Sequence, residues 1–149
     1  MLLAIVAIAM PLAHVVELPN KLALDGALWL AVQQHLYRGW GPFFGGPVEI
    51  GALITSLLFI YIARQDLRTR LLMIAASLAY IGMIAAFFML NRSVNEAVAI
   101  WTASTIPPYW REARMRWESG HCIAFVFSLI GAWSVLRGHF YIALRPQPH

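Results

Sequence analysis

The sequence has few charged residues and almost no cysteine. Only 12% of its 149 residues are Asp, Glu, Lys or Arg, whereas 60% are hydrophobic; soluble domains usually carry about 25% charged residues. The single cysteine, Cys122, excludes an internal disulfide and a thiolate metal cage. Basic residues are scattered between apolar runs instead of gathered on one face, so we expect no nucleic acid as a partner. An ordinary soluble domain is therefore excluded.

In place of charged residues, the sequence contains long apolar runs. A helix needs about 20 apolar residues to cross a bilayer, and four segments come close to this length: residues 1–18, 47–63, 71–90 and 118–136. The first has neither a basic start nor a small-residue cleavage site, so we interpret it as a mature span and not as a removable signal. Many of the aromatic residues lie near the ends of these runs, as in a membrane interface belt. We expect one all-α transmembrane domain over residues 1–149, in contact with a lipid bilayer.

The connections between the runs predict how the spans are arranged. Residues 64–70 are too few for anything but a tight turn between antiparallel neighbours, which predicts an integral membrane up-down four-helix bundle. Residues 20–44 contain an amphipathic, aromatic-rich stretch, interpreted as an interfacial helix in the first long loop. Residues 91–117 form the second long connection. Both long connections then lie on one side and both termini on the other, and the arginines of the short turn favour cytoplasmic termini.

Ionisable residues inside or beside the apolar runs are the informative ones, because burying them in lipid costs several kcal/mol. Two pairs, His14 with Glu17 and Glu118 with His121, are each three residues apart and therefore share a helix face. Glu49 stands in the first turn of the second span. In an up-down bundle these helix ends meet at one membrane face, so the five residues predict a single site.

Three chemistries suit such a site. Carboxylates with imidazoles bind Fe, Mn, Zn or Cu, and the pattern resembles that of di-iron and di-manganese bundles, with one ion expected here. In this interpretation all five residues are metal ligands, and the catalytic ones are Glu49, Glu118 and His121. A second interpretation makes His14 and His121 the axial ligands of haem b. In the third there is no cofactor, and a carboxylate removes a proton from an activated carbon or a phenol.

The same residues also fit plain interfacial ion pairs. In that interpretation Glu17 neutralises Lys21, and Glu118 neutralises Arg114. Lys21 continues the face that carries Glu17 only if the helix survives Pro19.

A family resemblance is found in two parts of the chain. The first part comprises residues 14–21 and the stretch ValGlnGlnHisLeuTyrArgGlyTrp at residues 32–40, and the second comprises residues 91–102 and 109–121. The most specific run comprises Asn91, Asn95, Trp101, Trp110, Arg114, Trp117, Glu118 and His121. Over nearly its whole length the chain resembles the anthrone-oxygenase-like family of small four-span membrane proteins, whose bacterial members are largely of unknown function. The resemblance implies a membrane-embedded oxygenase, which in the better-studied fungal members acts on polycyclic aromatic polyketides. We accordingly expect a bacterial inner membrane protein.

The sequence thus predicts an integral membrane oxygenase or other oxidoreductase. Its substrate is expected to be a hydrophobic small molecule, aromatic or quinone-like, bound at a polar site on one membrane face. The residues expected to orient this substrate are Tyr37, Asn91, Asn95 and Trp117. The alternative is a non-catalytic small accessory subunit of a larger respiratory or photosynthetic membrane complex, and a homo-oligomer is also open. Gly82 and Gly131 suit helix contacts in either case.

Overall fold

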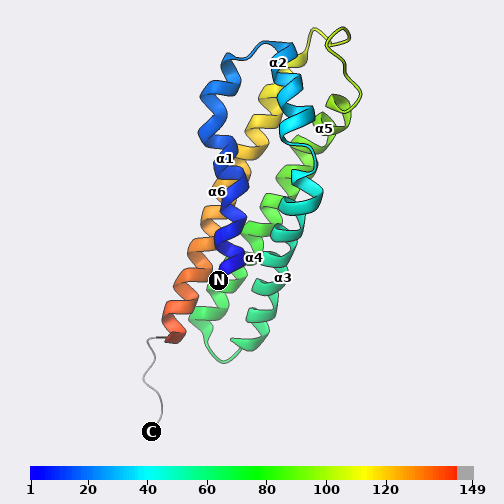
Figure 1. Cartoon of the computed structure of the whole chain (residues 1–149). Helices are drawn as coiled ribbons and strands as arrows, with labels where there is room; N and C mark the ends of the chain where they lie inside the picture. The colour runs from blue at the N-terminus through cyan, green and yellow to red at the C-terminus, as the bar shows by residue number, and fades with distance from the viewer. Residues whose placement is uncertain (144–149) are drawn as a thin grey trace.

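The computed structural model describes residues 1–143, which form helices joined by short turns and one longer loop (Figure 1). Three of the elements are single-turn π-helical segments, written η. The elements in chain order are α1 (Leu2–Ala23), α2 (Gly26–Ala31), η1 (Val32–Leu36), η2 (Gly41–Gly45), α3 (Gly46–Ile62), α4 (Leu67–Ala86), η3 (Phe87–Asn91), α5 (Arg92–Val98) and α6 (Trp110–Ala143).

The four long helices α1, α3, α4 and α6 lie side by side and alternate in direction (Figure 1). Contacts join α1 to α3, α3 to α4, α4 to α6 and α6 back to α1. The turn at residues 63–66, the start of α1 and the end of α6 lie toward one end, called the turn end below. The opposite end, called the loop end, carries α5 and the loop at residues 99–109. This is the arrangement of helix directions that the short connection predicted.

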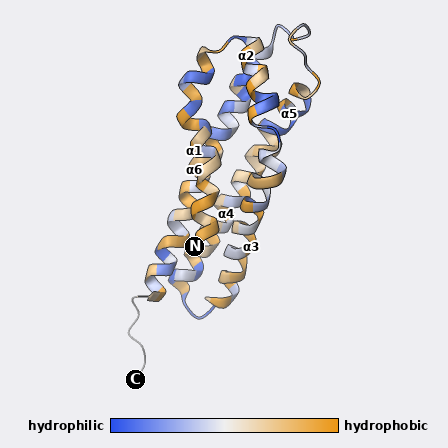
Figure 2. Ribbon diagram, in the orientation of Figure 1, coloured by the Kyte–Doolittle hydropathy of each residue, from blue (hydrophilic) through white to orange (hydrophobic). Residues whose placement is uncertain are grey.

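Four helical stretches of the described chain are long and apolar enough to cross a membrane: Leu2–Ala23, Gly26–Ile62, Leu67–Val98 and Trp110–Ala143. Large apolar side chains such as Leu58, Leu78 and Trp133 are exposed on the outer faces. Figure 2 shows hydrophobic residues along the middle of the long helices and hydrophilic ones gathered toward the two ends. This distribution is typical of helices surrounded by lipid.

Helix α1 is longer than predicted, because it continues through Pro19 to Ala23 and does not end at residue 18. The extended end is held by α6, where Nη1 of Arg114 donates hydrogen bonds to the carbonyl oxygens of Lys21 (3.1 Å) and Leu24 (2.9 Å). Carbonyls in the last turn of a helix have no partner within it, so this side chain caps α1. The extension brings Lys21 to the inner face of α1, where it is buried.

The first connection also differs from the predicted interfacial helix. Helices α2 and α3 follow one another along the same side of the molecule, separated by η1 and η2 (Figure 1). Trp29 of α2 is fully buried, and Leu30 beside it is 3% exposed. Both belong to an aromatic-rich cluster with residues of α5 and α6, including Val94, Trp110 and Trp117. The aromatic residues of this segment therefore serve tertiary packing as well as an outer face.

The core between the long helices is built from small residues around a few large ones. Alanines of α1, α3, α4 and α6 surround Tyr80 and Met83. A Cβ on Gly82 would lie 2.7 Å from the ring of Phe127, and one on Gly131 would lie 2.7 Å from the ring of Tyr80. Both glycines thus permit close contact between α4 and α6 within this chain.

Candidate functional site

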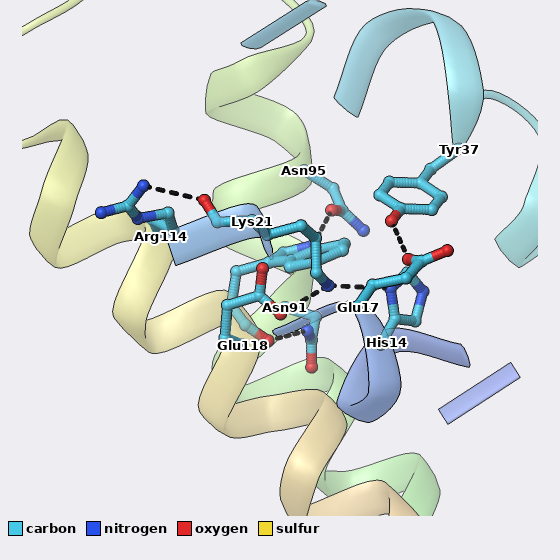
Figure 3. Close-up of polar contacts among 9 residues, drawn as sticks. His14, Glu17, Lys21, Tyr37, Asn91, Asn95, Arg114 and Glu118 are labelled. Atoms are coloured by element: carbon cyan, nitrogen blue, oxygen red, sulfur yellow. Dashed lines mark hydrogen bonds and ion pairs between the residues drawn. The ribbon is translucent and has the colours of Figure 1, made fainter. Parts of the chain in front are cut away.

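Helices α1 and α6 bring a buried ion pair together near the loop end (Figure 3). The ammonium nitrogen Nζ of Lys21 donates to Oε2 of Glu118 at 2.7 Å, and it lies 3.3 Å from Nδ1 of His14. The side chains of Lys21 and Glu118 are only 4% and 2% exposed. Together with His121, these residues are called the polar cluster below.

The two imidazoles of the polar cluster lie against each other. The ring centroids of His14 and His121 are 3.9 Å apart, with an interplanar angle of 33°. The indole of Trp117 meets both rings edge to face, at 4.8 Å from His14 and 4.2 Å from His121. Tyr37 makes a similar contact with His14 at 4.6 Å, and Trp40 lies 6.2 Å from it. Aromatic side chains from α6 and the first connection therefore surround the imidazoles.

The same aromatic rings face the lysine. Nζ of Lys21 lies 5.0 Å from the centroid of the Trp117 ring and 5.6 Å from that of Tyr37. A cation within about 6 Å of an aromatic face is attracted by the negative potential of that face. The rings, the carboxylate and the imidazole together replace the water that Lys21 loses on burial.

Glu17 joins the polar cluster indirectly. The hydroxyl of Tyr37 donates a hydrogen bond to its carboxylate, which ties the first connection to α1. The plain ion-pair interpretation therefore has the wrong partners: Lys21 pairs with Glu118 instead of Glu17, and Arg114 bonds to backbone carbonyls instead of Glu118.

Two asparagines hold Trp117 in place. The Asn91 amide nitrogen donates to the Trp117 carbonyl at 2.8 Å, and Oδ1 of Asn95 accepts from the indole nitrogen at 2.8 Å. Asn91 fits because Gly120 has no side chain, since a Cβ there would overlap the Asn91 amide. Both asparagines bond to this tryptophan, so they position the indole that contacts the histidines.

Glu49 lies apart from the others. It is half-buried on α3 and lines a small hollow with Val6, Ala7 and Met10 of α1, nearer the middle of the molecule. The structure thus brings together His14, Glu118 and His121, with Glu17 reached through Tyr37, and it does not bring Glu49 into the group.

The donor set does not fit the predicted metal ion. Within residues 1–143, no three His, Cys, Asp or Glu side chains come together in a way that could hold a metal. The ammonium of Lys21 occupies the space between the His14 imidazole and the Glu118 carboxylate, where a metal ion would have to be placed. A positive side chain in that space repels a second cation. The described residues therefore give no support to the five-residue metal shell, which stays a prediction.

The predicted haem does not fit either. Axial imidazoles bind the iron from opposite faces, with metal–nitrogen bonds of about 2 Å on each side and the macrocycle between them. The centroids of His14 and His121 are only 3.9 Å apart. This separation leaves no room for a macrocycle between the two rings.

Lys21 lies at the centre of the polar cluster, but the sequence did not predict it as a site residue. It lies seven residues after His14, a spacing that returns to the same helix face after two turns. The prediction that the first helix ends before Pro19 removed Lys21 from that face.

The polar cluster also contains one hydrogen-bond acceptor that is not used. Oε1 of Glu118 is buried and has no hydrogen-bond partner among the described residues.

Comparisons of the chain with protein-family models, with curated proteins and with solved structures gave no match in any of the three. Because a fold alone does not imply a function, the residues of the polar cluster are the basis for assigning one.

Proposed function

We propose that this protein is an integral membrane four-helix bundle that binds a hydrophobic aromatic or quinone-like molecule at the polar cluster and oxygenates it. One observation carries the proposal: a buried Lys21–Glu118 ion pair that touches a histidine, lies among aromatic rings and keeps one carboxylate oxygen unpartnered. Ionisable groups within membrane spans are costly and by default indicate function.

The unpartnered oxygen defines one feature of the ligand. A buried acceptor without a hydrogen bond carries a desolvation penalty of about 1–3 kcal/mol, which a suitable donor relieves. A phenolic or enolic hydroxyl placed against Oε1 of Glu118 supplies this donor. A planar aromatic ring in turn suits the edges and faces offered by Trp117 and Tyr37.

The ion pair supports proton removal. Glu118 acts as the base that accepts a proton from the hydroxyl or from an acidic carbon beside a carbonyl. The ammonium of Lys21 is placed to stabilise the negative charge that develops on the substrate oxygen. These roles need no cofactor, as in the third chemistry that the sequence predicted.

The oxygenation itself follows from the family resemblance and balances with O₂ as the oxidant. An activated CH₂ loses both hydrogens and becomes C=O. One oxygen atom enters the product, and the other leaves as water with the two hydrogens. The substrate supplies all four electrons, so no external reductant is required.

The test uses the purified protein in lipid nanodiscs with anthrone as the probe. The wild type should consume one O₂ for each anthraquinone formed, above the uncatalysed rate. Glu118→Gln should lower this rate by at least about 100-fold, in the range typical of general-base loss. The matched control is Glu96→Gln, because Glu96 is an exposed carboxylate paired with Arg92 on α5, and its rate should not change.

Equal rates for Glu118→Gln and wild type would overturn the proposed role of the carboxylate. Failure of the wild type to turn over anthrone or to bind 1,4-naphthohydroquinone would overturn the site proposal. That outcome would favour the alternative, a non-catalytic accessory subunit of a larger membrane complex.

We also propose that the turn end faces the cytoplasm in a bacterial inner membrane. Arg64, Arg68 and Arg70 are exposed at that end. At the loop end, Lys21 and Arg114 are buried and partnered within the chain. Arg38, Arg92, Arg111 and Arg116 are exposed at the loop end as well. The proposal therefore rests on the three arginines gathered in the one short turn, since short loops count most in this rule.

A further inference from the structure

The turn end of the molecule, where α4 begins and α6 ends (Figure 1), has an excess of positive charge. Four exposed arginines lie there: Arg64, Arg68, Arg70 and Arg137. Residues 50–95 contain one acidic residue, Asp66, and residues 119–149 contain none. The Asp66 carboxylate accepts a hydrogen bond from the hydroxyl of Thr69. This end of the molecule therefore attracts a partner with negative charge.

Two of these arginines, one on each of two neighbouring helices, lie against the same aromatic ring. Cζ of Arg68 on α4 is 5.9 Å from the centroid of the Tyr141 ring, and Cζ of Arg137 on α6 is 5.4 Å from it. Cζ of Arg137 is also 5.7 Å from the centroid of the Trp133 ring. A cation within about 6 Å of an aromatic face is attracted to it. Tyr141 thus holds Arg68 and Arg137 together, and these two residues are called the arginine pair below.

Close packing of α4 on α6 explains why the arginine pair forms. Gly138, the residue after Arg137, is buried, and a Cβ there would lie 2.7 Å from the methyl carbon of Met73 and 3.6 Å from Cγ2 of Thr69. Thr69, the residue after Arg68, is fully buried at the same contact. Because the two helices are antiparallel and each residue advances by about 100°, the residues that precede this contact lie on the same side of it.

Exposed apolar side chains continue the outer surface from the arginine pair toward the middle of the molecule. On α6, Trp133 and Leu129 precede Arg137 by four and eight residues, a spacing that keeps them on its helix face. On α4, Leu71 follows Arg68 by three residues and is exposed as well. A molecule bound along this surface would meet two positive charges at one end and apolar side chains along the rest. A phospholipid with an anionic headgroup has this combination, whereas free phosphate lacks the apolar part.

We propose that the arginine pair is a binding site for an anionic phospholipid of the bilayer, with the lipid phosphate at the two guanidinium groups and an acyl chain along Trp133 and Leu129. Guanidinium groups donate paired hydrogen bonds to phosphate oxygens. Tryptophan and tyrosine are typical of the depth at which headgroups lie, and basic sites between transmembrane helices bind such headgroups. The proposal depends on insertion of the helices into a membrane. It does not depend on the chemistry proposed for the polar cluster, which lies near the loop end.

Native mass spectrometry of the purified protein in detergent tests the site. Phosphatidylglycerol and phosphatidylcholine with identical acyl chains are added in equal amounts, so that only the headgroup differs. The wild type should bind phosphatidylglycerol about tenfold more tightly than phosphatidylcholine, because two basic residues face the anionic headgroup. The double variant Arg68→Gln/Arg137→Gln should lose this preference. Tyr141→Leu should reduce it, because the ring that holds the two guanidinium groups together is removed.

The matched control is Arg64→Gln/Arg70→Gln, which removes the same charge from the same end of the molecule and leaves the arginine pair intact. It should keep most of the preference for phosphatidylglycerol. All four arginines are exposed, so both double variants should unfold at the wild-type concentration of SDS, and a lost preference then reports on the lipid site. Equal loss in the two double variants would show attraction to the overall charge of this end and overturn a defined site. Equal binding of the two lipids to the wild type would also overturn the proposal. Neither result would bear on turnover of anthrone.

Discussion

At the scale of single residues, the polar cluster depends on Lys21 being completely compensated. Removing two charges from water costs several kcal/mol for each ion, and only good geometry with further hydrogen bonds offsets this cost. Glu118, the His14 ring nitrogen and two aromatic rings surround the ammonium. A change at either end of the ion pair therefore leaves the other end buried and uncompensated.

We accordingly expect Lys21→Met to lower the free energy of unfolding by about 3–5 kcal/mol, because Glu118 would remain as an unpaired buried charge. The double variant Lys21→Met/Glu118→Leu should recover most of this loss, because both charges are then removed. Stability is measured by SDS titration in mixed micelles. Arg92→Ala, which breaks the exposed Arg92–Glu96 pair, should cause little change. Additive losses in the double variant would show that the pair is not coupled.

At the scale of elements, single π-helical turns adjoin the site at three places. Tyr37 directly follows η1, Trp40 directly precedes η2, and Asn91 is the last residue of η3. A π-turn shifts the following residues around the helix axis, and such turns are frequent at functional sites. Between η1 and η2, Gly39 adopts a positive φ of 82°, which glycine reaches without the steric cost of a side chain. These features aim Tyr37 and Trp40 at His14.

The contact between η3 and α6 gives a prediction for glycine. Gly120→Ala should destabilise the protein by about 1–3 kcal/mol, because its Cβ would overlap the Asn91 amide and force a shift. Gly41→Ala is the matched control, since no atom lies within 4 Å of an added Cβ there. Adding Asn91→Ser to Gly120→Ala should restore part of the stability measured by SDS titration. A fully tolerated Gly120→Ala would contradict the close packing of η3 on α6.

At the scale of the whole molecule, the alternating helices place the turn and the second long connection at opposite ends. The turn at residues 63–66 lies at the turn end, and the loop at 99–109 lies at the loop end (Figure 1). If the four helices cross a bilayer, these two segments are exposed to different aqueous compartments.

Cysteine labelling tests this topology. Gln65→Cys and Ser104→Cys are introduced separately into a Cys122→Ala background. In sealed, inside-out vesicles a membrane-impermeant maleimide should label the cysteine at 65 and leave the one at 104 unlabelled until the membrane is permeabilised. The Cys122→Ala parent should remain unlabelled throughout. Labelling of both cysteines before permeabilisation would contradict the transmembrane arrangement.

The sequence by itself determined the features that depend on local composition and spacing. Apolar runs of adequate length predicted the four long helices, and the short connection predicted their antiparallel order. The three-residue spacings of His14 with Glu17 and of Glu118 with His121 predicted shared helix faces, which meet near the loop end.

Only the tertiary structure decided which groups pair and what space remains between them. Glu17 lies four residues before Lys21 on the same helix, yet Lys21 pairs with Glu118 of α6. Tyr37 binds Glu17, and Arg114 bonds to the end of α1 beyond Pro19. These contacts join residues far apart in the chain, so no local pattern encodes them. The position of Glu49, apart from the polar cluster, has the same cause, because coordination requires convergence in three dimensions, which helix periodicity alone does not determine.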